Sequence, residues 1–157
     1  MFLYQTFPPE LIIVDLQAED KDEVFEEMAD KFCQTTGISS REDVLQALWE
    51  RETKMSTGIQ KGVAIPHGKV SSVKDVRGVL GISKKGIDYD ALDDQPVYLV
   101  FMLLVPQTDS EEHLMLLKRL ADMLHNHKFY SELSAQNNQN NVNDVIRKFE
   151  DIYIASE

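Results

Sequence analysis

Residues 97–105 read VYLVFMLLV, a nearly continuous apolar run. A strand that is covered on both faces has this pattern, because neither of its faces needs polar side chains for water. Residues 77–84 (RGVLGISK) indicate a second strand, and residues 11–17 (LIIVDLQ) indicate a third. We therefore expect an α/β fold in which helices cover both faces of a sheet.

A helical pattern follows the strand indicated at residues 11–17. The apolar pattern of residues 24–32 predicts a helix that ends at Gly37. Ser39 or Ser40 can cap a second helix, whose apolar face begins at Val44 and runs on towards Met55. Residues 56–69 contain three glycines and a proline and predict a loop, a brief strand and a turn.

The C-terminal third is also expected to be mainly helical. Asp109 or Ser110 can cap a helix after Pro106. The apolar stripe of that helix consists of Leu114, Leu117, Leu120, Ala121 and Leu124. A short helix is expected at residues 127–135. Residues 136–144 (QNNQNNVND) are polar and repetitive and predict a loop before a last helix.

Composition limits the classes of partner. The length of 157 residues suits a single domain over residues 1–157, without disulfide support. Sixteen basic residues against 27 acidic ones give a net charge of −11, which disfavours nucleic acid and anionic membranes and favours a basic protein partner. The single cysteine, Cys33, is expected to be a small buried hydrophobe in a reducing compartment.

Nothing in the sequence predicts insertion into a membrane or export. There is no run of about 18 apolar residues, and the start MFLYQTFPPE lacks the basic and apolar regions of a secretory signal. We therefore expect a cytoplasmic protein.

His67 is the leading candidate for chemistry. It follows Val63-Ala64-Ile65-Pro66 and precedes Gly68, so a short strand should deliver the imidazole to a point where the chain turns. Imidazole is nucleophilic and partly neutral near pH 7. The alternative is that His67 is an ordinary turn residue.

Arg51 lies three residues after Leu48 and seven after Val44, which places it on the apolar stripe of the second predicted helix. A bound anion would explain a guanidinium there, because its planar fork can donate to two phosphate oxygens. The alternatives are that the side chain extends outward to water or pairs with Glu52.

His113 shares a helix face with Leu117 and Leu120, so its ring should point towards the sheet or towards whatever lies over the start of the helix. A neutral second imidazole beside His67 could donate a hydrogen bond to a phosphoryl group, although a purely structural histidine fits the same pattern. His125 and His127 are expected at the surface, since their spacing matches no strong metal motif. The segment TGIQKG is neither a P-loop nor GxGxxG, and we expect no nucleotide, metal or other cofactor.

Three stretches together resemble a known family. RETKMSTGIQKGVAIPHGK, GIDYDALDDQPVYLVFMLLVP and EEHLMLLKRLADML are similar to the enzyme IIA domain of the fructose–mannitol type in the bacterial phosphotransferase system, including its nitrogen-regulatory relatives. The likeness covers residues 8–153. It implies an α/β sandwich whose mixed sheet is flanked by helices.

The resemblance also implies roles for residues. His67 would be the phosphorylated histidine, through Nε2, with Arg51 and His113 as its companions in the site. Gly68, Ser56 and Thr57 would support the phosphoryl group. A shallow site that two proteins reach in turn would have an apolar rim, for which the sequence offers Ile59, Val63 and Ile65.

By the same resemblance, the phosphodonor would be the small carrier HPr or a paralogue. The acceptor in sugar uptake would be a cysteine of an enzyme IIB. No IIB or membrane domain follows within these residues, so we expect any transport role to use a separate IIB. The alternative is a regulatory IIA that binds other proteins according to its phosphorylation state.

Overall fold

The computed structural model describes residues 1–108 and 111–157. Its helices are α1 (Leu3–Thr6), the short 3₁₀ helix η1 (Pro9–Leu11), α2 (Lys21–Thr36), α3 (Arg41–Glu52), α4 (Glu111–Leu124), α5 (His127–Ser134) and α6 (Gln139–Ala155). Its strands are β1 (Ile12–Ile13), β2 (Gly58–Gln60), β3 (Val63–Ala64), β4 (His67–Lys69), β5 (Arg77–Ile87) and β6 (Val97–Val105). No helix within the described ranges is long and apolar enough to cross a membrane.

The strands form one mixed sheet in the order β1-β5-β6-β3-β2. Strand β4 lies off this path and pairs directly with β6. Strand β6 runs antiparallel to β5 and parallel to β3 and β4, while β1 runs parallel to β5. The mixed sheet that the family resemblance implied is therefore confirmed. Since β6 touches three other strands, it is the centre of the sheet.

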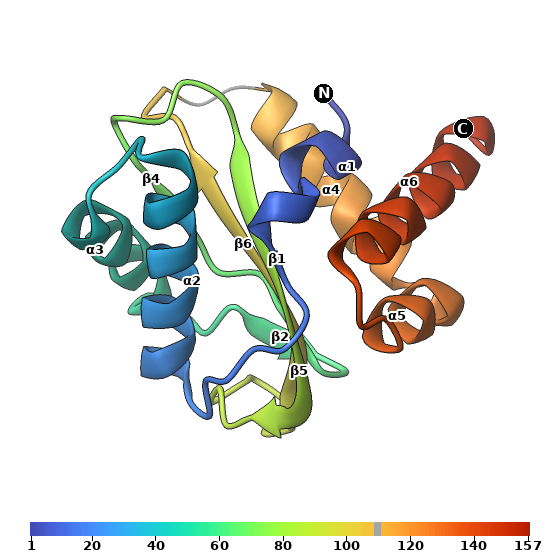
Figure 1. Cartoon of the computed structure of the whole chain (residues 1–157), viewed down its shortest axis with the longest axis horizontal. Helices are drawn as coiled ribbons and strands as arrows, with labels where there is room; N and C mark the ends of the chain where they lie inside the picture. The colour runs from blue at the N-terminus through green and yellow to red at the C-terminus, as the bar shows by residue number, and fades with distance from the viewer. Residues whose placement is uncertain (109–110) are drawn as a thin grey trace.

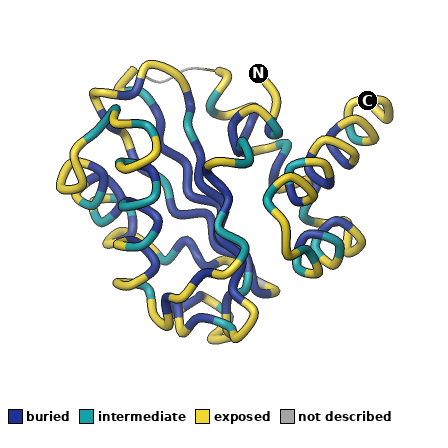
Figure 2. The backbone as a smooth tube through the Cα atoms, viewed as in Figure 1, coloured by how far each residue is buried: buried dark blue, intermediate teal, exposed yellow. Residues whose placement is uncertain are grey.

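Helices cover both faces of this sheet, as the apolar run of residues 97–105 predicted (Figure 1). Val100 and Met102 of β6 enter a core beneath α2 and α3, which we call the α2/α3 core. Phe101 and Leu103, one residue out of phase, enter a core beneath α1, α4, α5 and α6, the α4/α6 core. Figure 2 shows the central strands buried between these layers. Side chains of a strand alternate between faces, so one apolar strand serves both cores.

Several predicted boundaries were wrong. The strand expected at residues 11–17 shortens to the two residues of β1, and the helix expected to reach Met55 ends at Glu52. Residues 136–144, expected to be a loop, include the first two turns of α6. The helix starts there because the Asn138 side chain accepts hydrogen bonds from the N–H groups of Asn140 and Asn141, which caps its N-terminus.

The expected apolar face of α4 was partly wrong. Leu114 is 64% exposed, whereas Leu116, Leu120 and Met123 are buried in the α4/α6 core. Leucines recur so often between residues 114 and 124 that two overlapping stripes satisfy the helical period, and packing selects one of them. The helix caps expected at Asp109 and Ser110 lie outside the described residues.

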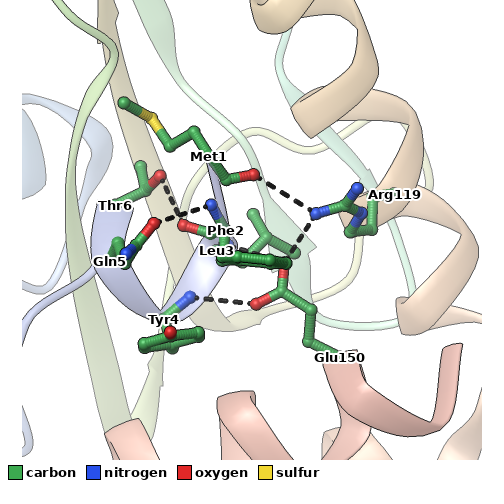
Figure 3. Close-up of polar contacts among 8 residues, drawn as sticks. All are labelled: Met1, Phe2, Leu3, Tyr4, Gln5, Thr6, Arg119 and Glu150. Atoms are coloured by element: carbon green, nitrogen blue, oxygen red, sulfur yellow. Dashed lines mark hydrogen bonds and ion pairs between the residues drawn. The ribbon is translucent and has the colours of Figure 1, made fainter. Parts of the chain in front are cut away.

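The N-terminal segment, for which no element was predicted, is anchored by Glu150 of α6 (Figure 3). The Glu150 carboxylate accepts hydrogen bonds from the backbone N–H groups of Leu3 (2.7 Å) and Tyr4 (3.2 Å). Arg119 of α4 donates to the same carboxylate at 2.9 Å, with the Glu150 side chain only 1% exposed. This ion pair ties α1, α4 and α6 together.

Candidate functional site

His67 is the first residue of β4 and is half-buried. Its Nδ1 lies 2.9 Å from the carbonyl oxygen of Ile65. Because a carbonyl can only accept, Nδ1 must carry the proton in this arrangement. Nε2 then keeps its lone pair, and the ring is set up as a nucleophile through Nε2.

The surroundings of His67 favour its neutral form. Burial lowers the pKa of His67 below its ordinary value, and the positive charge of Arg51 lowers it further. The hydrogen bond to the Ile65 carbonyl and the negative charge of Glu52 act in the opposite direction but do not outweigh burial. The imidazole is therefore predominantly neutral near pH 7, as a nucleophile requires.

His67 lies on the face of the sheet that α4 covers. It pairs in register with Leu103 of β6, and partners in a parallel pair direct their side chains to the same face. Leu103 belongs to the α4/α6 core, whereas Leu104, opposite Gly68, belongs to the α2/α3 core. Among the described strands, β4 pairs with β6 alone, so its other edge carries no strand beside His67.

Gly68 allows β4 to approach the backbone of α3. A Cβ at this position would lie 2.6 Å from the carbonyl carbon and 2.7 Å from the carbonyl oxygen of Ala47. The N–H of Leu103 donates to the Pro66 carbonyl, and the N–H of Val70 donates to the Val105 carbonyl. Every second residue of this segment therefore turns its backbone N–H and carbonyl groups towards β6, which puts the Gly68 N–H on that side too. Gly68 thus sets the position of the histidine by close packing.

We expect Gly68→Ala to destabilise the fold by about 3 kcal/mol, because backbone atoms of α3 must move to admit the methyl group. Urea unfolding of the variant and the wild type would measure the change in the free energy of unfolding. Gly37→Ala is the matched control. That position has nothing within 4 Å of a Cβ but a φ of +65°, so it should cost only about 1 kcal/mol. Equal losses in the two variants would contradict the packing argument.

Arg51 lies in the last turn of α3 and is half-buried. Its Nη1 donates to the backbone oxygen of Met55 at 2.8 Å, which folds the side chain over the loop after the helix. Its positive charge lowers the pKa of His67. Pairing with Glu52, one of the alternatives considered, is replaced by this contact.

Glu52, adjacent to Arg51, is buried, with its side chain 2% exposed. Oε2 accepts from Lys21 Nζ at 3.0 Å and from the backbone N–H of Thr57 at 2.9 Å. Oε1 accepts from the Thr57 hydroxyl at 2.7 Å, and that hydroxyl also lies 2.7 Å from the Tyr89 hydroxyl. Burial, with the charge of Glu52 as the next cause, raises the pKa of Tyr89 well above its usual range.

Ser56 and Thr57 differ in what they offer to a ligand. Ser56 is half-buried, and its Oγ accepts from the N–H of Gly58 at 3.2 Å. Thr57 is 4% exposed, and both its N–H and its hydroxyl bind Glu52. Both hydrogen-bond donors of Thr57 are therefore already used by Glu52, so Thr57 supports the site from its buried side.

His113 lies in the first turn of α4 and is half-buried, with its Nε2 atom fully buried. Helix α4 follows β6, and its buried residues share the α4/α6 core with Leu103. His113 and His67 therefore belong to the same face of the sheet.

A groove of about 390 Å³ is lined by residues of β2, β3, α4 and α5 and by Ile65, two residues before His67. All three expected rim residues line it, with Ile59 47% exposed and Val63 and Ile65 each 7% exposed. The groove is completed by Lys61, Ala121, Leu124, His125, His127 and Tyr130. Ile65 lines this groove, and its carbonyl oxygen accepts the hydrogen bond from His67. One lining residue of the groove therefore contacts the candidate nucleophile.

The remaining candidates lie away from this chemistry. His125 and His127 are exposed, as expected. Cys33, expected to be a small buried hydrophobe, packs against the α2/α3 core but is only half-buried, and burial raises the pKa of its thiol. Across residues 1–108 and 111–157, no group of three or more His, Cys, Asp or Glu side chains is arranged to hold a metal ion.

Sequence reasoning missed the support behind the site. Glu52 lies four residues after Leu48, so an acid on the apolar stripe of α3 could have been noticed as a buried charge in need of a partner. Lys21 and Tyr89 carried no such signal, because they come from distant parts of the chain. Only the fold brings them to Glu52.

Comparison with known proteins identifies relatives along nearly the whole chain. The sequence model of the family described as "Phosphoenolpyruvate-dependent sugar phosphotransferase system, EIIA 2" matches residues 5–149. A fructose-specific EIIABC component of Bacillus subtilis is 32% identical over 137 residues, which are 87% of this chain. This chain spans only 22% of the length of that relative.

Two solved structures share the fold. The nitrogen regulatory protein IIA-Ntr of Neisseria meningitidis is 31% identical and aligns with a TM-score of 0.84, over 92% of this chain and 98% of that one. A complex of enzyme IIAMTL with phosphorylated enzyme IIBMTL from Escherichia coli aligns with a TM-score of 0.74 at 20% identity, over 90% of this chain and 97% of that one. The second likeness concerns the fold alone.

Proposed function

Because the chain belongs to the EIIA 2 family of the phosphoenolpyruvate-dependent sugar phosphotransferase system, we propose that it is a phosphohistidine carrier whose acceptor atom is Nε2 of His67. The observation that carries the proposal is the hydrogen bond between Nδ1 and the Ile65 carbonyl, which leaves Nε2 as the nucleophile. The chain would act as a single cytoplasmic EIIA domain over residues 1–157.

The proposed transfer is an in-line displacement at phosphorus. The Nε2 lone pair of neutral His67 attacks the phosphoryl group of the donor's phosphohistidine, a new N–P bond forms, and the donor's N–P bond breaks. The electron pair of the broken bond returns to the donor's imidazole. The proton stays on Nδ1 of His67, hydrogen-bonded to the Ile65 carbonyl, so the new phosphohistidine keeps this contact.

The supporting residues compensate charge and set position, which are the main sources of catalysis in phosphoryl transfer. The Arg51 guanidinium would donate to the equatorial phosphoryl oxygens, and His113 would donate one further hydrogen bond from the α4 side. The Ser56 hydroxyl would donate another hydrogen bond to the phosphoryl group. Gly68 and Thr57 would act through position, since the first admits α3 and the second holds Glu52. None of these steps uses a cofactor.

HPr or a paralogue is the proposed donor, and a cysteine of an enzyme IIB is the proposed acceptor. The IIA–IIB complex from Escherichia coli supports the choice of acceptor, because it pairs a protein of this fold with a phosphorylated IIB. The exposed apolar side chain of Ile59, which lines the groove, offers a contact for such partners.

A regulatory role is the second candidate, favoured by the likeness to IIA-Ntr over 92% of this chain. Phosphate on His67 would then add negative charge to a docking surface and change the affinity for a target protein. Pull-downs with phosphorylated and unphosphorylated protein discriminate between the roles. Targets that bind both forms equally would argue against a switch.

The decisive test is labelling of the wild-type chain with a phosphoenolpyruvate-driven donor system that ends in HPr. We expect one phosphate per chain. It should be lost in acid and kept in alkali, because the N–P bond of a phosphohistidine is acid-labile. An acid-stable phosphate, or none after complete phosphorylation of HPr, would contradict the proposed function. Mass spectrometry of the alkaline digest would assign the phosphate to its residue.

A further inference from the structure

A line of hydrogen bonds connects the buried carboxylate of Glu52 to the imidazole of His67. Glu52 binds the N–H and the hydroxyl of Thr57. The carbonyl of Thr57 accepts from the N–H of Ile65 at 3.0 Å, and the carbonyl of Ile65 accepts from Nδ1 of His67 at 2.9 Å. A displacement of Thr57 would therefore be transmitted to the ring of the nucleophile.

The far end of this line is fixed by charge. Burying a carboxylate is unfavourable unless a cation and further hydrogen bonds compensate for the lost water. Lys21 of α2 supplies the cation at 3.0 Å, with its side chain 15% exposed. The Lys21 Nζ also lies 4.9 Å from the centroid of the Tyr89 ring, a cation–π contact. Glu52 is thus balanced by a cation from outside its own helix, and that cation is itself held against Tyr89.

Close packing leaves Thr57 little room to move. Its hydroxyl is held between Glu52 and the fully buried Tyr89. At the next residue, a Cβ on Gly58 would lie 2.8 Å from both the Tyr89 ring and the Cβ of Ala91. Thr57 and Gly58 are therefore confined by Glu52, Tyr89 and Ala91, and this fixes the Thr57 carbonyl to which Ile65 binds.

We propose that Glu52 is a positioning residue for His67: its carboxylate, balanced by Lys21, fixes Thr57 and through Ile65 holds the imidazole in the tautomer that exposes Nε2. The proposal deepens the proposed phosphoryl transfer and rests on it for its role in the rate. The tautomer of His67 can be measured without any transfer, so the two ideas can fail separately.

The chain contains a matched control for the loss of a buried acid. Glu150 is 1% exposed and, like Glu52, accepts from one cation and from backbone N–H groups, here those of Leu3 and Tyr4 (Figure 3). It lies in the α4/α6 layer, and its partners lead to the N-terminal segment instead of to His67. Glu52→Gln and Glu150→Gln are the same substitution in two comparable settings.

The experiment measures the nitrogen-15 shifts of the His67 ring across pH in both variants, together with the rate of labelling by the phosphoenolpyruvate-driven system that ends in HPr. In Glu52→Gln we expect the shifts to move from a single Nδ1–H tautomer towards a mixture. The pKa of His67 should fall, because the negative charge of Glu52 raises it. The labelling rate should drop by about 10- to 100-fold, as a misplaced reactive group causes. Glu150→Gln should lose stability but keep the ring shifts and the rate.

Two results would overturn the proposal: wild-type ring shifts in a folded Glu52→Gln protein, or equal changes in the ring shifts of the two variants. A tautomer change without any labelling of the wild type would support the positioning role and contradict the proposed function. If Glu52→Gln does not fold, Thr57→Val and Thr57→Ser take its place. Valine removes the hydroxyl bonds and serine keeps them, so the ring shifts should change in the first variant and be restored in the second.

Discussion

Replacing His67 with glutamine is expected to reduce labelling to the level of the unphosphorylated control. Glutamine keeps a polar side chain on β4 but has no nitrogen lone pair that can form an N–P bond, so the loss should be complete. Labelling is measured with the phosphoenolpyruvate-driven system that ends in HPr, followed by mass spectrometry of the intact protein. HPr itself should stay fully phosphorylated in the same tube.

A loss of labelling could also follow from unfolding, which urea denaturation of the variant would reveal. His67 is half-buried and its ring makes one backbone contact, so the free energy of unfolding should change by only about 1 kcal/mol. A folded His67→Gln protein that still takes up a full phosphate would move the acceptor to another side chain, with His113 the first to test.

Replacing Arg51 with alanine is expected to slow labelling by about 100- to 1,000-fold, the usual effect of removing a group that stabilises transition-state charge. The guanidinium makes one hydrogen bond to the Met55 backbone, so the fold should lose only about 1 kcal/mol. The rate constant is measured under single-turnover conditions with phosphorylated HPr in excess.

The same variant has a spectroscopic signature. The positive charge of Arg51 lowers the pKa of His67, so its removal should raise that pKa, and an NMR titration of the ring would record the change. Arg51→Lys is the matched control. It keeps the charge and so the low pKa, but it loses the planar fork and should label at a rate between those of Arg51→Ala and the wild type. Wild-type labelling by Arg51→Ala would remove the residue from the proposed mechanism.

The main layers of the fold could be predicted because the information is local. The unbroken apolar run of β6 requires cover on both faces, and the period of α2 and α3 supplies it on one of them. Helix α1 could not be predicted in this way. Helix α1 has four residues, and its first N–H groups are satisfied by Glu150, which lies almost at the other end of the chain.

The candidate site also combines residues that the local sequence indicates with residues that only the fold brings together. His67 and Arg51 could be named from sequence, because each sits in a local pattern that ordinary packing does not explain, and in the structure the positive charge of Arg51 lowers the pKa of His67. The network behind them could not be named. Lys21, Glu52 and Tyr89 meet only when α2, α3 and the segment after β5 have packed together.

The anchoring of α1 by Glu150 has a consequence for synthesis of the chain. Leu3 and Phe7 are fully buried in the α4/α6 core, yet the carboxylate that receives the Leu3 N–H lies 147 positions later. A growing polypeptide on the ribosome must therefore keep its first helix undocked until α6 has emerged. Its apolar face stays available to chaperones throughout that interval, and closure of this core is a late step in the folding of this domain.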